Sequence, residues 1–281
     1  MEQDKLQLQR FELKYIVSEE VALAVRDFVK GYLEIDEYGA LRPDLSYPVH
    51  SLYLDSEDMS IYHRTINGDK NRYKLRIRYY DDRPTAPVFF EIKRRMNNII
   101  LKQRCGVKRE GLDWVLAGHL PDPSQLLSKD PRHVFAIQNF INLMMHDHAR
   151  PKAHVFYMRE AWISRHDNSV RVTMDRNVLC DPDFTSQLLV KTNNPVVVFG
   201  KEVILELKFT NRFPDWFGHL VQVFHLMQCG AAKYVDGVTL LGERIPSRDR
   251  RISGDHLSDA ARGARDRARQ MDPEAVTPAL S

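Results

Sequence analysis

The chain has 281 residues, of which 43% are hydrophobic and 28% charged, a composition typical of a soluble globular protein. No apolar run approaches the roughly 20 residues of a membrane helix, and the acidic and polar start, MEQDKLQLQR, does not resemble a signal peptide. We therefore expect a cytoplasmic protein with one large domain. A net charge of +3 is too small for a protein that binds nucleic acid over its whole surface, so the placement of the charges has to be informative.

The first part of the chain is predicted to be rich in strands. Period-2 alternation with β-branched and aromatic residues dominates residues 10–110. One helix interrupts it, starting at the N-cap Ser18 and ending at about Gly31. Residues 110–150 lose the alternation and space their apolar residues as a helix does, which predicts a helical insert between two groups of strands.

The second part returns to strands and then becomes highly charged. We expect three strands and one amphipathic helix, at residues 153–163, 169–178, 202–209 and 214–229 respectively. From residue 246 the sequence is rich in charge, Ala and Ser and poor in large apolar residues, so it cannot bury enough surface to order itself. The sequence thus predicts a domain over residues 1–245 and a flexible charged tail over 246–281.

Six of the predicted strands have one ionic face and one apolar face. Because successive side chains of a strand point to opposite sides, each of the following groups shares a face: Arg10, Glu12 and Lys14; Lys74, Arg76 and Arg78; Glu91 and Lys93; Lys102, Arg104 and Lys108; Arg171, Thr173 and Asp175; Glu206 and Lys208. A sheet with one face in water also alternates. However, these faces are almost entirely ionic, bases outnumber acids, and Glu-x-Lys occurs three times among them.

A closed barrel accounts for these ionic faces better than a solvated sheet. Closing the sheet turns the ionic face into a lumen and leaves the apolar face outside, where helices can cover it. Crowded Lys and Arg side chains would repel one another there unless the ligand is an anion of high charge density, such as a phosphate chain. The lumen carboxylates are suitable ligands for Mg²⁺ or Mn²⁺. Basic side chains with a carboxylate-bound metal are typical of phosphoryl transfer.

Several motifs, taken in order, resemble the VTC domain, the polyphosphate-polymerase branch of the triphosphate tunnel metalloenzymes. They are RFELKY, YLD, KLRIRYY, FFEIKRR, KQR, YMREAW, VRVTMDRNV, ILELKF and AAKY, and they span roughly residues 9–241. The resemblance implies an α+β fold, an antiparallel β-barrel tunnel with a charged lumen and helices packed outside. It also implies transfer of the γ-phosphate of ATP onto a growing polyphosphate chain, with Mn²⁺ or Mg²⁺ as cofactor.

The resemblance also implies roles for individual residues. The catalytic set would be Arg76, Arg78, Lys93, Lys208 and Glu206. Further phosphate-binding residues would be Lys14, Lys102, Arg104, Arg159, Arg171 and Lys233, and the metal ligands Glu206, Glu12 and Glu91. ATP and polyphosphate are the expected partners, together with a separate membrane protein and without nucleic acid, because the basic faces carry few aromatics on which bases could stack.

Two departures from the family pattern leave alternatives open. Arg10 stands where the hydrolytic members of the superfamily have a glutamate, which favours the polymerase branch. Asp236 stands where polymerase members have a second lysine. The alternatives are a tunnel-type triphosphatase and a non-catalytic module that binds polyphosphate or inositol phosphates. We expect Asp55 and Asp175 to have structural roles.

Overall fold

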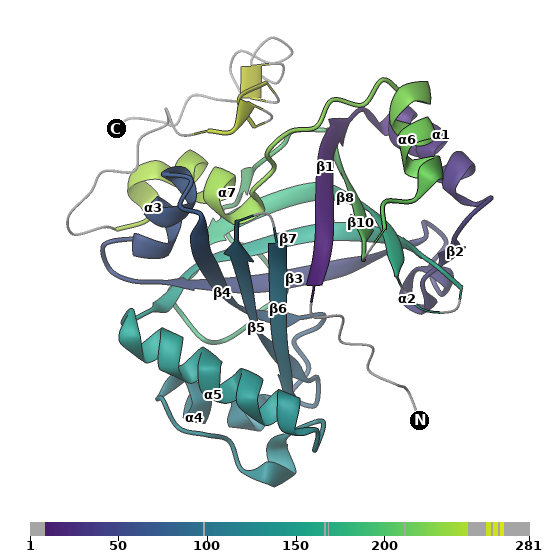
Figure 1. Ribbon diagram of the computed structural model, residues 1–281. Coiled ribbons are helices and arrows are strands. Elements are labelled where there is room, and N and C mark those ends of the chain that lie inside the picture. The colour runs from purple at the N-terminus through teal and green to yellow at the C-terminus, as the bar shows by residue number, and fades with distance from the viewer. Residues whose placement is uncertain are drawn as a thin grey trace.

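A computed structural model describes residues 9–97, 99–165, 167, 169–210, 212–246, 257–259, 261–263 and 265–266. Its strands are β1 (Gln9–Val17), β2 (Glu34–Ile35), β3 (Ser46–Asp55), β4 (Asn71–Tyr79), β5 (Val88–Met96), β6 (Ile99–Val107), β7 (Arg150–Ile163), β8 (Val170–Pro182), β9 (Val196–Val197) and β10 (Val203–Phe209). They form one antiparallel sheet in the order β2-β7-β3-β4-β5-β6-β1-β10-β8-β9 (Figure 1). The mixed helix and strand composition agrees with the expected α+β class.

The α-helices are α1 (Glu19–Val29), α2 (Glu37–Ala40), α3 (Ser60–Ile66), α4 (Leu112–Leu116), α5 (Pro131–His146), α6 (Asp215–Val223) and α7 (Lys233–Leu241). The Ser18 side chain caps α1 by accepting a hydrogen bond from the Val21 N–H, as predicted. The insert also has the predicted helices, α4 and α5. None of the helices in the described residues has both the length and the apolar character needed to cross a bilayer.

The helix predicted over residues 214–229 is shorter than expected. It ends at Val223, and His225 two residues later has a left-handed φ of 48°, which a continuing α-helix cannot include. The chain then runs beside β1, where Gln228 pairs with Tyr15, before α7 begins. α7 has no counterpart among the helices predicted from the sequence.

The sheet is not joined equally at every strand. β7 pairs with both β3 and β8, so these three strands lie side by side. β1 pairs with β10 from Phe11 to Val17, but with β6 only through Gln9 and Arg10. The two strands then separate, so the sheet is not closed along this seam. The expected closed barrel is therefore not confirmed, and the confirmed part of the prediction is the antiparallel sheet.

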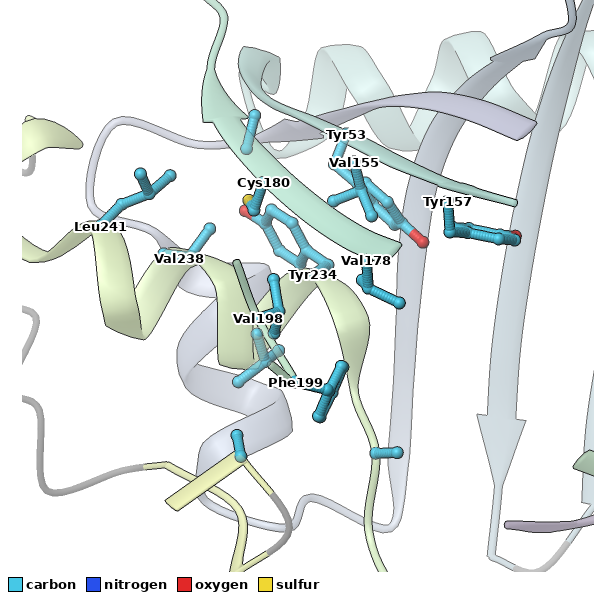
Figure 2. Close-up of a cluster of buried hydrophobic side chains, with 14 of the residues drawn as sticks. Tyr53, Val155, Tyr157, Val178, Cys180, Val198, Phe199, Tyr234, Val238 and Leu241 are labelled. Atoms are coloured by element: carbon cyan, nitrogen blue, oxygen red, sulfur yellow. The ribbon is translucent and has the colours of Figure 1, made fainter. Parts of the chain in front are cut away.

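Three of the helices cover the outward apolar faces of the sheet. α5 lies against β5 and β6, with the Phe140 ring in edge-on contact with Phe90. α1 and α6 contribute to a second outward apolar cluster with β1 and β10. α3 and α7 contribute to a third cluster, which contains Tyr234 and, from the inner face of the sheet, Tyr53 and Tyr157 (Figure 2). The ionic side chains share the inner face with this third cluster.

Part of the predicted tail packs on the domain. The Leu257 side chain is 6% exposed and the Ala261 side chain is fully buried, and both belong to the apolar cluster of α3 and α7. For residues 246–281 the composition predicts a flexible charged tail. Two apolar side chains and a short helical turn are enough to attach the described part of this segment.

α7 lies unusually close to β8. A Cβ atom at Gly237 would be 2.5 Å from Cβ of Cys180, which is closer than side chains allow. Only glycine permits this approach. The helix therefore rests directly on the strand, with its N-terminal residue Lys233 pointing into the ionic face.

Candidate functional site

Strand register brings the ionic side chains of distant segments together. Arg76 on β4 is opposite Glu91 on β5, which is opposite Arg104 on β6. On the other side of the seam, Lys14 of β1 is opposite Glu206 of β10. Because paired residues in antiparallel strands point to the same side, the predicted ionic faces form one continuous surface.

Glu91 is the centre of the first ionic cluster. Its buried carboxylate lies 2.6 Å from Arg76, 2.8 Å from Lys102, 3.6 Å from Arg104 and 3.9 Å from Arg78. Burial raises the pKa of Glu91, but Lys102 and the arginines lower it more, so that it lies well below its usual value. A single negative charge is thus surrounded by four cationic groups.

Tyrosine hydroxyls fix Arg76 and Arg78 of β4. Arg76 donates to the Tyr53 hydroxyl at 3.1 Å, and Arg78 donates to the Tyr157 hydroxyl at 2.9 Å. Tyr53 and Tyr157 lie on β3 and β7, and Figure 2 shows both rings within the buried cluster. The sequence analysis did not identify them, although Tyr53 belongs to the YLD motif. Anchored in this way, the guanidinium groups are held in place before any ligand binds.

Glu206 is the centre of the second cluster. It lies 2.5 Å from Lys208, 3.0 Å from Lys233, 3.4 Å from Arg159 and 3.5 Å from Lys14. Burial raises its pKa, but the surrounding lysines lower it well below the usual range. Burial lowers the pKa of Lys208 to about 7, although Glu206 acts in the opposite direction.

Asp175 joins the second cluster. Both of its oxygens accept from Arg159 at 2.7 Å, and its carboxylate lies 2.7 Å from the Lys233 ammonium. These ion pairs are compatible with the structural role predicted for it.

Lys14 connects the second cluster to a third, smaller one around Glu12. Its ammonium lies 3.2 Å from Glu12 and 3.5 Å from Glu206, and it donates to the Ala231 carbonyl at 2.8 Å. Glu12 also lies 2.9 Å from Lys93. One lysine is therefore shared by two carboxylates.

Cationic groups outnumber carboxylates in the three clusters. Among the described residues they contain nine bases, Lys14, Arg76, Arg78, Lys93, Lys102, Arg104, Arg159, Lys208 and Lys233, and four acids, Glu12, Glu91, Asp175 and Glu206. Nine minus four leaves an excess of five positive charges when all are ionised. Crowded charges of one sign are unfavourable in a partly desolvated site, so an anion is the complementary ligand.

Arg171 differs from the other predicted phosphate-binding residues. It is on the ionic face, yet its guanidinium pairs with Asp36 at 3.0 Å and donates to the Tyr47 hydroxyl at 3.3 Å. It therefore lies beside the clusters rather than within them.

A cavity of about 220 Å³ opens where β1 and β6 separate. Its charged lining includes Glu12, Lys14, Arg72, Lys74 and Lys93. The pKa of Lys74 is lowered to about 7. Burial is the largest cause, and the positive charges of the neighbouring Lys14 and Lys93 act in the same direction. Lys74 was not among the predicted site residues, although it shares a face with Arg76.

The VTC domain family matches residues 9–242. The chain belongs to this family. A crystal structure of a "putative adenylate cyclase" from Bacillus halodurans is similar with a TM-score of 0.48 and 14% identity, over 79% of this chain and 93% of that one. The Mimivirus capping enzyme triphosphatase is similar with a TM-score of 0.34 and 10% identity, over 78% and 90%. No curated protein matches the sequence.

The predicted metal ligands are all paired with bases in this VTC domain. Mg²⁺ and Mn²⁺ sites often use one or two carboxylates together with phosphate oxygens. Glu12 and Glu206 lie closest to such an arrangement, but both contact the Lys14 ammonium within 3.5 Å, and a cation between them would have to displace it. The described residues contain no group of three or more acidic, His or Cys side chains placed for metal binding. Glu91 is in a separate cluster, surrounded by bases.

Proposed function

We propose that this VTC domain is a polyphosphate polymerase, which transfers the γ-phosphate of ATP onto a growing polyphosphate chain and releases ADP. The observation that carries the proposal is the presence of nine basic and only four acidic side chains in the three clusters of the ionic face. Membership of the VTC domain family supports a substrate with several phosphates. We also propose that the curved sheet acts as a tunnel around that substrate.

The clusters would divide the work of holding the phosphates. Arg76 and Arg78 would clamp the nucleotide phosphates, since Glu91 and the tyrosines already fix their direction. Lys93, in the cluster around Glu12, and Lys208, in the cluster around Glu206, would hold the γ-phosphate. The remaining basic residues, Lys14, Lys102, Arg104, Arg159, Arg171 and Lys233, would neutralise the rest of the chain.

The transfer needs no general base. A terminal oxygen of the acceptor chain attacks the γ-phosphorus, the bond from that phosphorus to the β–γ bridging oxygen breaks, and ADP leaves with the electron pair. Because the attacking oxygen is already an anion, catalysis consists of positioning and charge neutralisation. A divalent cation held by Glu206 and Glu12 would supply further neutralisation of the phosphate oxygens.

The test is an incubation of the purified protein with ATP and Mn²⁺ or Mg²⁺, with the products separated on a polyphosphate gel. Glu206→Ala is the test variant. Glu34→Ala is the matched control, because Glu34 is exposed and pairs with Arg165 away from the ionic clusters. We expect a ladder of chains from the wild type and the control, and none from Glu206→Ala.

Other outcomes identify the alternatives. Free phosphate without chains would indicate a tunnel-type triphosphatase. Tight binding of polyphosphate with no turnover in either metal would indicate a phosphate-binding module. Either result would overturn the polymerase assignment.

A further inference from the structure

Asp236 of α7 accepts hydrogen bonds from the residue before its own helix and from the C-terminal segment. Its buried carboxylate accepts from the Ala232 N–H at 2.8 Å and from the Ser258 N–H at 3.0 Å. Ala232 directly precedes α7, whereas Ser258 belongs to the C-terminal segment. Both oxygens are thus occupied by backbone donors, and Asp236 is not one of the groups that face the ligand site.

The residues held by Asp236 contribute directly to the ionic face. Lys233, the first residue of α7, reaches Asp175 at 2.7 Å and Glu206 at 3.0 Å. The carbonyl of Ala231 accepts from Lys14, and Ala231 and Ala232 line the cavity. The start of α7 therefore determines where two of the lysines lie.

The C-terminal segment is attached to α7 by more than this hydrogen bond. Leu257 and Ala261 are buried in the same apolar cluster as Tyr234 and Val235 of α7. The Ser258 hydroxyl accepts from the Ala261 N–H at 3.3 Å, which stabilises the turn that presents the Ser258 N–H. The apolar contacts place the segment, and the hydrogen bond joins it to the ligand site.

We propose that Asp236 is a positioning residue and that the described part of residues 257–266 is a strap that holds the start of α7, so that Lys233 bridges Asp175 and Glu206. The strap acts on anion binding through Lys233 and not by touching the ligand. This inference depends on the proposed function only in assuming that the ionic face binds phosphate chains.

The experiment uses the full chain and tripolyphosphate as a probe that binds without transfer. Ser258→Pro removes the backbone N–H that Asp236 accepts, and proline is tolerated at the start of a helix. Ser258→Ala is the comparison variant, because it keeps that N–H and removes only the hydroxyl, which proline removes as well. We expect Ser258→Pro to weaken tripolyphosphate binding about tenfold, and Ser258→Ala to weaken it clearly less.

A double-mutant cycle separates positioning from general stability. If the strap acts through Lys233, Ser258→Pro will have little further effect on affinity when Lys233 is already replaced in Lys233→Met. Additive effects of the two substitutions would overturn the proposal. So would unchanged affinity in Ser258→Pro.

Hydrogen exchange distinguishes failure of this inference from failure of the proposed function. Exchange of the Ala232 and Lys233 amides is expected to accelerate more in Ser258→Pro than in Ser258→Ala, whether or not the protein binds phosphates. Wild-type protein that does not bind tripolyphosphate would overturn the proposed function alone. Unchanged amide exchange in Ser258→Pro would overturn the strap.

Discussion

The Lys233 ammonium lies 3.0 Å from Oε1 of Glu206, although the two residues are 27 positions apart in the chain. Glu206 is on a central strand of the sheet and Lys233 is the first residue of the last α-helix of the domain. The pair joins the end of the folded domain to its charged interior. Since Glu206 also contacts three other bases, this pair is one of several that the same carboxylate makes.

Replacing Lys233 should affect anion binding more than stability. Breaking a buried ion pair usually costs about 3 to 5 kcal/mol because one charge is left unpaired. Here Glu206 keeps Lys208 and Asp175 keeps Arg159, so we expect Lys233→Met to lower the free energy of unfolding by less than about 1 kcal/mol. The affinity for tripolyphosphate should fall about tenfold or more. Urea denaturation and calorimetric titration measure the two quantities, with exposed Lys201→Met as control.

Arg76→Ala should reduce turnover on the order of 10²-fold, the usual cost of removing one fixed electrostatic contact to a transition state. Glu91 would still have Lys102, Arg104 and Arg78 beside it, so we expect the fold to survive. Initial rates of ADP release test this, with Arg83→Ala as control because the Arg83 side chain is 76% exposed. Full activity in Arg76→Ala would remove this residue from the clamp.

Lys74 should make anion binding depend on pH near neutrality. With a pKa of about 7, it is protonated in acid and loses its proton as the pH rises towards 9, so affinity for tripolyphosphate should fall over this range. Besides Lys14 and Lys93, the groups that act on it are Asp236, which raises its pKa, and Arg72, which lowers it. Lys74→Arg keeps the charge and should make the profile less steep, leaving the part that comes from Lys208, whose pKa is also about 7.

Wild type and Lys74→Arg are titrated under the same conditions, because the ionisation of tripolyphosphate then affects both profiles equally. Identical slopes would show that Lys74 does not contact the anion. In the absence of ligand, the free energy of unfolding should change with pH in the direction opposite to the affinity. Between about pH 7 and the ordinary lysine value of about 10.4, the unfolded chain binds more protons, so stability should rise with pH.

Asp55→Ala should destabilise the domain without involving the ligand site directly. Its carboxylate accepts from the N–H groups of Ser56, Ile61 and Tyr62 and from the Tyr234 hydroxyl. Leaving several buried donors without an acceptor should cost about 3 kcal/mol or more. Thermal and urea unfolding measure the loss, with exposed Asp27→Ala as control. A change below about 0.5 kcal/mol, which is typical of surface substitutions, would contradict this structural role.

Alternation along single strands was sufficient to predict which side chains share the ionic face. Arg76, Glu91 and Arg104 are together as expected, because the period of a strand is set by backbone geometry alone. Which carboxylate meets which base was not predictable. The proximity of Lys14 to Glu206 depends on register between strands that are far apart in sequence. The proximity of Arg159 to Asp175 depends on a pairing of neighbouring strands whose register shifts between Phe156 and Met158.

Two elements, β3 and α7, have sequence patterns that only tertiary packing explains. β3 lies in the region predicted to be rich in strands, but it is buried along almost its whole length, so it lacks the alternation of the six ionic strands. α7 contains glycine and three β-branched residues, Val235, Val238 and Thr239, and has no side-chain N-cap. Its stability as a helix comes from burial of nearly every residue, which local propensity does not show.

The hydrogen atom at Gly237 determines the reach of a lysine one helical turn away. Lys233 and Gly237 are four residues apart and so lie on the same side of α7. A methyl group at residue 237 would meet Cys180 and push the helix away from β8, and the Lys233 ammonium, 2.7 Å from Asp175, would move outward with it. The charge distribution of the interior is thus tuned by an uncharged residue that no anion touches, and a search for functional positions limited to ionisable residues would overlook it.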